Sequence, residues 1–183
     1  INPVFVPVLN SGTSILLKKD DISIRISYDK EVPTPYNVKD TLDEPLHTVN
    51  NNNKPDCRID VYYQSIYVGS LVIDFKYRRP EKIFCPNEDK ALKQLHAYSV
   101  GLSSDVLYSN NVNPIIKNRI QPVSDVFAFT PVKKKKKIIT FSPSINLMLL
   151  APSVNTENIK ALLLEKSMSL IETYKELQKI NII

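Results

Sequence analysis

The sequence predicts an α/β domain built on a mixed β-sheet, and three observations carry this prediction. Two runs with a period of two, 56–63 and 69–77, are separated by a short turn and indicate an antiparallel hairpin. A segment with helical periodicity, 88–102, follows the hairpin, and another strand pattern follows that helix. Because a strand that returns after a helix can lie parallel to an earlier one, we expect a mixed sheet flanked by helices.

Size and composition fit one domain over all 183 residues, with 43% apolar and 23% charged residues, near the globular average. We divide it into an N-terminal strand and long loop (1–53), a central hairpin and helix (54–104), and closing strands with a C-terminal helix (105–183). The longest apolar run, Ile145–Ala151, is too short to span a bilayer, and no signal peptide is visible. We therefore expect a cytoplasmic protein with no membrane partner. The chain starts with Ile1 rather than Met, which we interpret as a piece of a longer protein.

The elements follow in order. In Ile15–Tyr28, isoleucines alternate with polar residues, which indicates a half-buried strand. From Val32 to Lys54 the alternation is lost among prolines, acidic residues and a run of asparagines, which predicts a long loop. The hairpin and its helix come next. Together these segments account for the first three strands and the first helix.

The closing part of the chain adds two strands and a helix. Val123–Thr130 is typical of a buried strand, and a further strand runs from Ile138 towards Leu150. The lysine run Lys133–Lys137 lies between them, and we interpret it as a solvated turn rather than a phosphate contact. An amphipathic helix over Thr156–Lys179 ends the pattern. The predicted order is strand, strand, strand, helix, strand, strand, helix.

The net charge and the cysteine content bear on the partners and on the metal sites that the chain could have. The net charge of +5 fits a nucleic-acid partner without demanding one. The spacing of Cys57 and Cys85 matches no metal motif, so we expect reduced thiols rather than a disulfide. The two histidines, His47 and His96, are far apart in the sequence and near no cysteine pair. We therefore expect no cluster of zinc ligands.

The hairpin is where chemistry is expected. If its turn is centred near Ser65, Asp56 and Asp74 lie opposite each other, because each is nine positions from the centre (65 − 56 = 74 − 65). Directly opposite residues share a face of the sheet, with Cβ atoms roughly 5 Å apart. Lys76, two residues beyond Asp74, shares that face. The other face is expected to hold the apolar residues Cys57, Ile59, Leu71, Ile73 and Phe75.

Two carboxylates this close repel each other unless a cation lies between them. Oxygen-only ligands favour a hard ion such as Mg²⁺, or Mn²⁺ in its place, which binds phosphate oxygens and activates a bound water. A neighbouring lysine can position that water or stabilise charge on the phosphate. The patch therefore has the parts for phosphodiester hydrolysis. The alternative is a salt-bridge ladder of Asp56, Asp74 and Lys76 on a solvated strand face.

The strings around these residues resemble a known family. Pro55-Asp56 followed by Asp74-Phe75-Lys76 resembles the signature of the PD-(D/E)XK nuclease superfamily. The longer strings KPDCRIDVY, LVIDFKYR and LKQLHAYSV resemble its McrC-like restriction endonuclease branch. The resemblance covers Asp56 to about Tyr98, and the rest of the chain by element order alone. It implies a restriction-endonuclease-like fold.

Carried over by position, the resemblance implies that Asp56 and Asp74 bind the metal together with the backbone carbonyl of Phe75. Lys76 would orient or activate the water. Gln94, on the following helix, matches a glutamine that supports this centre. Each of these roles is what the resemblance implies for the residue at that position.

Other residues have weaker claims. Tyr98 lies one turn from Gln94 on the same helix face, and both are also explained as the rim of an ordinary packed helix. Asp60 shares the strand face of the motif but has at most a minor role. The family fold normally opens with a helix that contributes a further acidic ligand. No such helix is visible here, and Glu31 and Glu44 are available only in loops.

The leading hypothesis is a Mg²⁺-dependent endonuclease domain acting on DNA, as the cleavage component of a restriction or defence system. It would depend on an NTPase motor or recognition subunit for site choice, and a double-strand cut would need two centres, as in a homodimer. One alternative is a catalytically inactive nuclease-fold module that binds DNA or a partner protein. Another is an unrelated β-rich interaction domain in which the aspartates and the lysine occur by chance.

Overall fold

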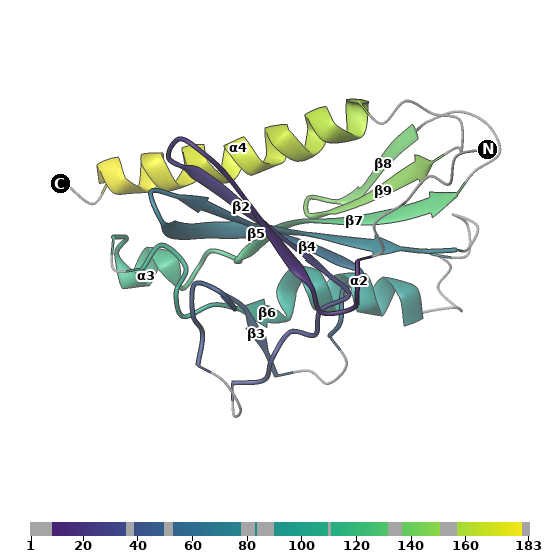
Figure 1. Cartoon of the computed structure of the whole chain (residues 1–183), viewed down its shortest axis with the longest axis horizontal. Coiled ribbons are helices and arrows are strands. Elements are labelled where there is room, and N and C mark those ends of the chain that lie inside the picture. The colour runs from purple at the N-terminus through teal and green to yellow at the C-terminus, as the bar shows by residue number, and fades with distance from the viewer. Residues whose placement is uncertain are drawn as a thin grey trace, which may run out of the picture.

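A computed structural model describes residues 9–35, 39–49, 53–77, 83, 90–109, 111–131, 137–150 and 157–180. It is an α/β structure with a mixed sheet and helices, as predicted (Figure 1). The strands are β1 (Ser14–Lys19), β2 (Ile22–Tyr28), β3 (His47–Thr48), β4 (Cys57–Tyr63), β5 (Ile66–Phe75), β6 (Leu102–Ser103), β7 (Val123–Pro131), β8 (Lys137–Ser142) and β9 (Ile145–Leu150). The helices are α2 (Lys90–Val100), α3 (Pro114–Lys117) and α4 (Glu157–Ile180).

Seven of these strands form one sheet in the order β1-β2-β4-β5-β7-β9-β8. The first four, β1, β2, β4 and β5, pair antiparallel in succession. After α2 the chain returns as β7, which lies parallel to β5, so the predicted parallel return is confirmed. Strand β9 lies parallel to β7, and β8 closes the edge antiparallel to β9. Strands β3 and β6 form a separate two-stranded sheet.

The sheet is covered on both faces. Helix α4 lies along one face, and α2, α3 and the β3–β6 pair lie on the other (Figure 1). Leu170, Ile171 and Tyr174 of α4 are buried against the sheet, which confirms the amphipathic character predicted for the last helix. From α2, Leu95 and Tyr98 are fully buried. Among the described residues, no helix combines the length and the apolar character that a bilayer crossing needs.

Two predicted strands are each a hairpin. Ile15–Tyr28 contains β1 and β2, joined at Asp20-Asp21, where Asp20 has a φ of +52°. The stretch from Ile138 towards Leu150 contains β8 and β9, joined by a short turn at 143–144. In both segments a polar pair or a proline interrupts an otherwise continuous strand pattern, and the chain reverses there. The lysine run also joins strands that are not neighbours, because β9 lies between β7 and β8.

The remaining boundaries shift by one to three residues. Within the described residues the central helix begins at Lys90 and ends at Val100, so Leu102, predicted as its last residue, belongs instead to β6. In the long loop predicted over Val32–Lys54, Val32 and Leu46 are buried, so the loop packs as a layer on the sheet. Residues 36–38, 50–52 and 132–136, and with them Cys85, lie outside the described residues.

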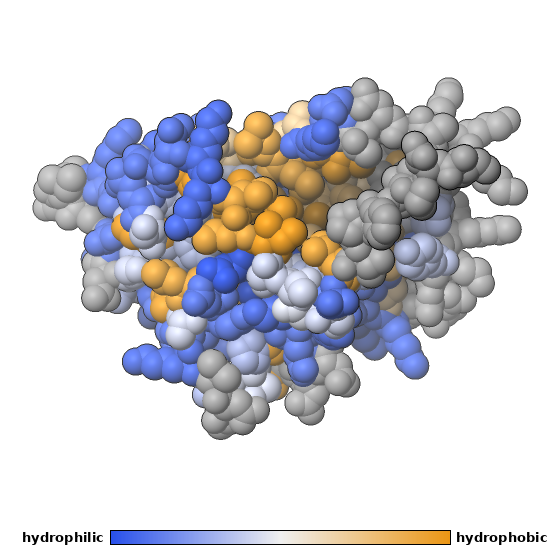
Figure 2. Space-filling model, in the orientation of Figure 1, coloured by the Kyte–Doolittle hydropathy of each residue, from blue (hydrophilic) through white to orange (hydrophobic). Residues whose placement is uncertain are grey.

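Part of the apolar face extends beyond α4. Ile15 and Leu17 of the edge strand β1 pair with Ile26 and Ile24, which continue the face that α4 covers further along. They remain 43% and 52% exposed. Figure 2 shows apolar side chains gathered between the β1–β2 hairpin and α4. The edge of the molecule at β1 is therefore unusually apolar for a solvated edge strand.

Gly69 is the position at which the packing of α4 on β5 depends most on a missing side chain. Its φ is +143°, and a Cβ there would lie 2.7 Å from Leu170 Cδ2 and 3.3 Å from the Pro122 carbonyl oxygen. We expect Gly69→Ala to lower the free energy of unfolding by about 2–4 kcal/mol, because backbone strain and overpacking add. Urea unfolding measures this loss.

Gly12→Ala is the matched control for Gly69→Ala. Gly12 also has a positive φ, +82°, but nothing lies within 4 Å of a Cβ built there. The Gly12→Ala substitution should lower the free energy of unfolding only by the backbone strain of a positive φ, about 1–2 kcal/mol. Equal losses at the two glycines would contradict the close contact with Leu170.

Candidate active site

The register of the β4–β5 hairpin sets the geometry of the candidate site. Cys57 pairs with Ile73, so the next position outward places Asp56 opposite Asp74, as the sequence predicted. The turn consists of Gln64 and Ser65, both with positive φ (50° and 64°), the conformation of a type I′ hairpin turn. The turn alone would pair Cys57 with Val72, but a β-bulge between Val61 and Tyr62 shifts the register by one residue. The shifted register places the two carboxylates on one face.

The two aspartates sit differently at the end of the hairpin. Asp56 is half-buried, and its Oδ2 accepts a hydrogen bond of 2.5 Å from the backbone N–H of Phe75. Asp74 is only 3% exposed and forms an ion pair with Lys76. The backbone N–H of Lys76 donates to the Phe129 carbonyl at 2.7 Å, which holds this end of the chain against β7. The motif is therefore anchored by backbone bonds on both sides.

Helix α2 supplies the rest of the cluster. Lys76 Nζ donates to Gln94 Oε1 at 2.7 Å, and Gln94 Nε2 donates to the Tyr98 hydroxyl at 2.8 Å. Tyr98 is fully buried. The two helix residues thus lie behind the lysine in a continuous chain of hydrogen bonds. The structure brings together Asp56, Asp74, Lys76, Gln94 and Tyr98, the set that the sequence singled out.

Burial gives this cluster its electrostatic character. Burial is the largest cause of the raised pKa of Asp74, which is about 6. The neighbouring Asp56 carboxylate also raises this pKa, whereas the ammonium of Lys76 lowers it. Burial also raises the pKa of Tyr98, and the Asp74 charge adds to that effect. The two aspartate carboxylates therefore repel each other, and a proton or a cation between them reduces that repulsion.

The stability of the chain is expected to depend on pH through Asp74. Its folded pKa of about 6 lies above the ordinary 3.8, so the folded state holds this proton more tightly. Stability from this group is therefore present at low pH and is lost as the pH rises towards 6 and beyond. We expect Asp74→Asn to remove a component of about 1 kcal/mol from the change in unfolding free energy between pH 5 and pH 8. Urea unfolding at both pH values tests it, and an unchanged pH dependence in the variant would contradict it.

In the described part of the chain, the acidic ligand expected from upstream of the first strand is not found. Glu44 instead forms ion pairs with Lys30 and with Arg58, and Glu31 is exposed. Among the described residues, no third carboxylate, histidine or cysteine groups with Asp56 and Asp74. The described part of the chain therefore offers two acidic side chains to a metal at this site.

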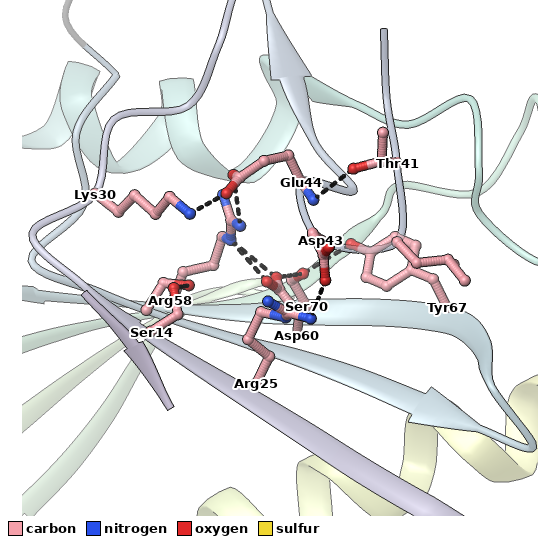
Figure 3. Close-up of polar contacts among 12 residues, drawn as sticks. Ser14, Arg25, Lys30, Thr41, Asp43, Glu44, Arg58, Asp60, Tyr67 and Ser70 are labelled. Carbon is pink, nitrogen blue, oxygen red and sulfur yellow. Dashed lines mark hydrogen bonds and ion pairs between the residues drawn. The ribbon is translucent and has the colours of Figure 1, made fainter. Parts of the chain in front are cut away.

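A second polar cluster, missed by the sequence reading, lies on the same face of the hairpin. Asp60, to which the sequence gave a minor role, is fully buried. It pairs with Arg58 Nε at 2.9 Å and accepts a hydrogen bond from Ser70 Oγ at 2.6 Å. Figure 3 shows Arg58 between Asp60 and Glu44, which ties the long loop to the sheet. The available signal was Arg58 and Asp60 alternating with apolar residues in a central strand.

The structure also groups side chains where no cluster was expected. His47 lies with Asp40 and Asp105, and one ligand atom from each lies within 4.8 Å of the others. The expectation that no zinc-ligand cluster forms considered only the cysteines and histidines, whereas this group joins one histidine to two aspartates. Asp105 is remote in sequence from Asp40 and His47, and the pairing of β3 with β6 and the hydrogen bond from the Asp105 N–H to Asp40 bring it to them. Cys57 is a free thiol among the described residues, and Cys85 lies outside them.

Comparison with known proteins adds no assignment: no family model, no curated protein and no solved structure matches the chain.

Proposed function

We propose that the chain is a metal-dependent endonuclease domain with a restriction-endonuclease-like fold, which hydrolyses DNA phosphodiester bonds. One observation carries the proposal. Asp56, Asp74 and Lys76 converge on one face of a hairpin, with Gln94 and Tyr98 hydrogen-bonded behind the lysine. This is the arrangement that the PD-(D/E)XK resemblance implies. A salt-bridge ladder on a solvated face explains it less well, because Asp74 is 3% exposed.

The residues fit a divalent cation such as Mg²⁺, or Mn²⁺. Asp56 and Asp74 offer only oxygen atoms, and a cation between the two neighbouring carboxylates would offset their repulsion. When bound there, such an ion polarises a phosphodiester and lowers the pKa of a water molecule. Lys76 occupies the place of that charge in the present arrangement, through its ion pair with Asp74.

Lys76 and Gln94 have the positioning roles. Gln94 accepts from Lys76 Nζ and donates to Tyr98, so the amide holds the ammonium at a fixed place on the face of the hairpin. An ammonium held there can orient a water molecule or stabilise charge that develops on a phosphate oxygen. Tyr98 fixes the amide because its ring is buried and its hydroxyl oxygen accepts the hydrogen bond from Gln94 Nε2.

Cleavage of supercoiled plasmid tests the proposal. We expect the protein to nick or linearise plasmid in the presence of Mg²⁺ or Mn²⁺ and to leave it intact with a chelator. The full-length protein, with any motor or recognition subunit that accompanies it, is the sample to use. Cleavage that is unaffected by chelation, or no cleavage by that complete assembly with either metal, would contradict the proposal.

A catalytically inactive nuclease-fold module that binds DNA or a partner protein is the second candidate. The observation in its favour is that the described residues add no third acidic ligand to Asp56 and Asp74. Retardation of DNA without cleavage, unchanged in Asp74→Asn, would favour this module over the enzyme.

The proposed partners follow from the nuclease activity. DNA suits the net charge of +5. An NTPase motor or recognition subunit would supply the choice of site. A second copy of the chain would supply the second centre that a double-strand cut needs, and the apolar edge at β1 is a surface on which copies can meet.

A further inference from the structure

Two residues of the segment 39–49 meet one residue from much later in the chain beside the small β3–β6 sheet. Asp40 comes from the long loop, His47 from β3, and Asp105 from the segment after β6. The Asp40 Oδ2 atom lies 2.8 Å from His47 Nδ1 and accepts a hydrogen bond of 2.6 Å from the backbone N–H of Asp105. The backbone of His47 pairs with that of Ser103, which precedes Asp105 by two residues. The cluster is therefore held by backbone structure as well as by its own contacts.

The Asp40 carboxylate is only half satisfied. Asp40 is 6% exposed, and its second oxygen, Oδ1, is buried with no hydrogen-bond partner among the described residues. An unpaired buried acceptor costs about 1–3 kcal/mol, and more when it is charged. A cation at the cluster would satisfy this atom and offset the repulsion between the two carboxylates. The buried oxygen thus points to a ligand independently of the grouping of the three side chains.

We propose that Asp40, His47 and Asp105 form a binding site for a divalent transition-metal ion of the Zn²⁺ class. One imidazole nitrogen and two carboxylates are ligands that Zn²⁺ takes in proteins. The imidazole separates this site from the oxygen-only pair Asp56 and Asp74, which suits Mg²⁺. The two sites share no residue, so the inference does not rest on the proposed function.

The site is open on one side. A pocket of about 270 Å³ is lined by His47, Asp105, Lys117 and neighbouring polar residues. Three protein ligands leave a coordination position for water or a small anion, as in open zinc sites. Asp105 is exposed, so its side chain has room to close on an ion. Lys117 donates from Nζ to the Asp105 carbonyl at 2.6 Å and so holds that segment in place.

Calorimetric titration with zinc chloride tests the site on the full chain after treatment with a chelator. We expect the wild type to bind one Zn²⁺ at this site. Both His47→Ala and Asp105→Asn are expected to weaken zinc binding by at least about 10–100-fold. This is the loss seen when a group that only supports a metal ligand is removed, and removal of a ligand itself should cost at least as much. Because Asp105 is exposed, its substitution tests the site even if His47→Ala fails to fold. Zinc should also raise the melting temperature of the wild type more than that of Asp105→Asn, since the ion joins the long loop to the segment after β6.

Two controls make the titration specific. His96→Ala removes the other histidine, which is exposed on α2, and should bind zinc as the wild type does. The double variant Asp56→Asn/Asp74→Asn should also retain this zinc site. Absence of zinc binding by the wild type, or equal affinity in wild type, His47→Ala and Asp105→Asn, would overturn the inference. Loss of the site in the Asp56→Asn/Asp74→Asn variant would do so as well.

Discussion

Asp74→Asn is expected to reduce metal-dependent DNA cleavage by about 10³-fold or more. The substitution removes one of the two carboxylates at the open end of the hairpin and leaves Asp56 alone. Stabilisation by a bound metal is worth several kcal/mol, and each 1.36 kcal/mol changes the rate tenfold. Initial rates of plasmid nicking in Mg²⁺ and Mn²⁺ measure the loss. Lys76→Met should cause a loss of about 10²–10³-fold, the range for removing one electrostatic stabiliser.

Asp125→Asn is the matched control for Asp74→Asn. Asp125 is also a buried aspartate of the sheet, 5% exposed, and it pairs with Lys166 of α4 at 3.1 Å, on the opposite face. Its removal should leave the cleavage rate of the folded fraction within a few-fold of wild type. An equal loss of activity in the two folded variants would assign the effect to stability rather than to the site.

Arg58→Met is expected to lower the free energy of unfolding by about 3–5 kcal/mol, because it leaves a buried charge without its partner. Arg58 is 1% exposed, and Asp60, which it pairs with, is fully buried. Glu44 would lose the same guanidinium, although Lys30 would remain. Since Arg58 joins the long loop to the sheet, we expect protection of that loop against amide exchange to fall as well.

The exposed ion pair of α4 provides the control for Arg58→Met. Lys160 and Glu157 are 70% and 64% exposed, so Lys160→Met should change stability by less than about 1 kcal/mol. The double variant Arg58→Met/Asp60→Asn should lose less than the sum of the two single losses, since the residues share one network. Additive losses would contradict the coupling drawn from the 2.9 Å ion pair.

Local pattern predicted most of the fold. The pairing of Asp56 with Asp74 was predicted from the period of two and a turn centred at Ser65. The turn is in fact Gln64-Ser65, and a β-bulge between Val61 and Tyr62, which the pattern did not indicate, brings the strands into the predicted pairing. The helical stripe of α4 was equally clear, since apolar residues recur over 24 residues. The splits at Asp20-Asp21 and at 143–144 were missed, because a short polar interruption fits both a turn and an irregular strand.

The candidate site was predictable only where it is local. Asp56, Asp74 and Lys76 lie on one hairpin, so strand geometry alone places them together. The chain from Lys76 to Gln94 to Tyr98 depends on how α2 packs, which periodicity does not give. The pairing of Asp40 with the N–H of Asp105 spans 65 residues, so no spacing in the sequence indicates it.

A crystal soaked in Mn²⁺ and measured near the manganese absorption edge tests the central claim most directly. We predict an anomalous peak between Asp56 and Asp74, at roughly 2.0–2.3 Å from an oxygen of each, with Lys76 Nζ displaced from Asp74 towards Gln94. If the Asp74–Lys76 ion pair instead persists and no manganese lies between the two aspartates, the hairpin face is a salt-bridge cluster and the hydrolytic function proposed here is contradicted.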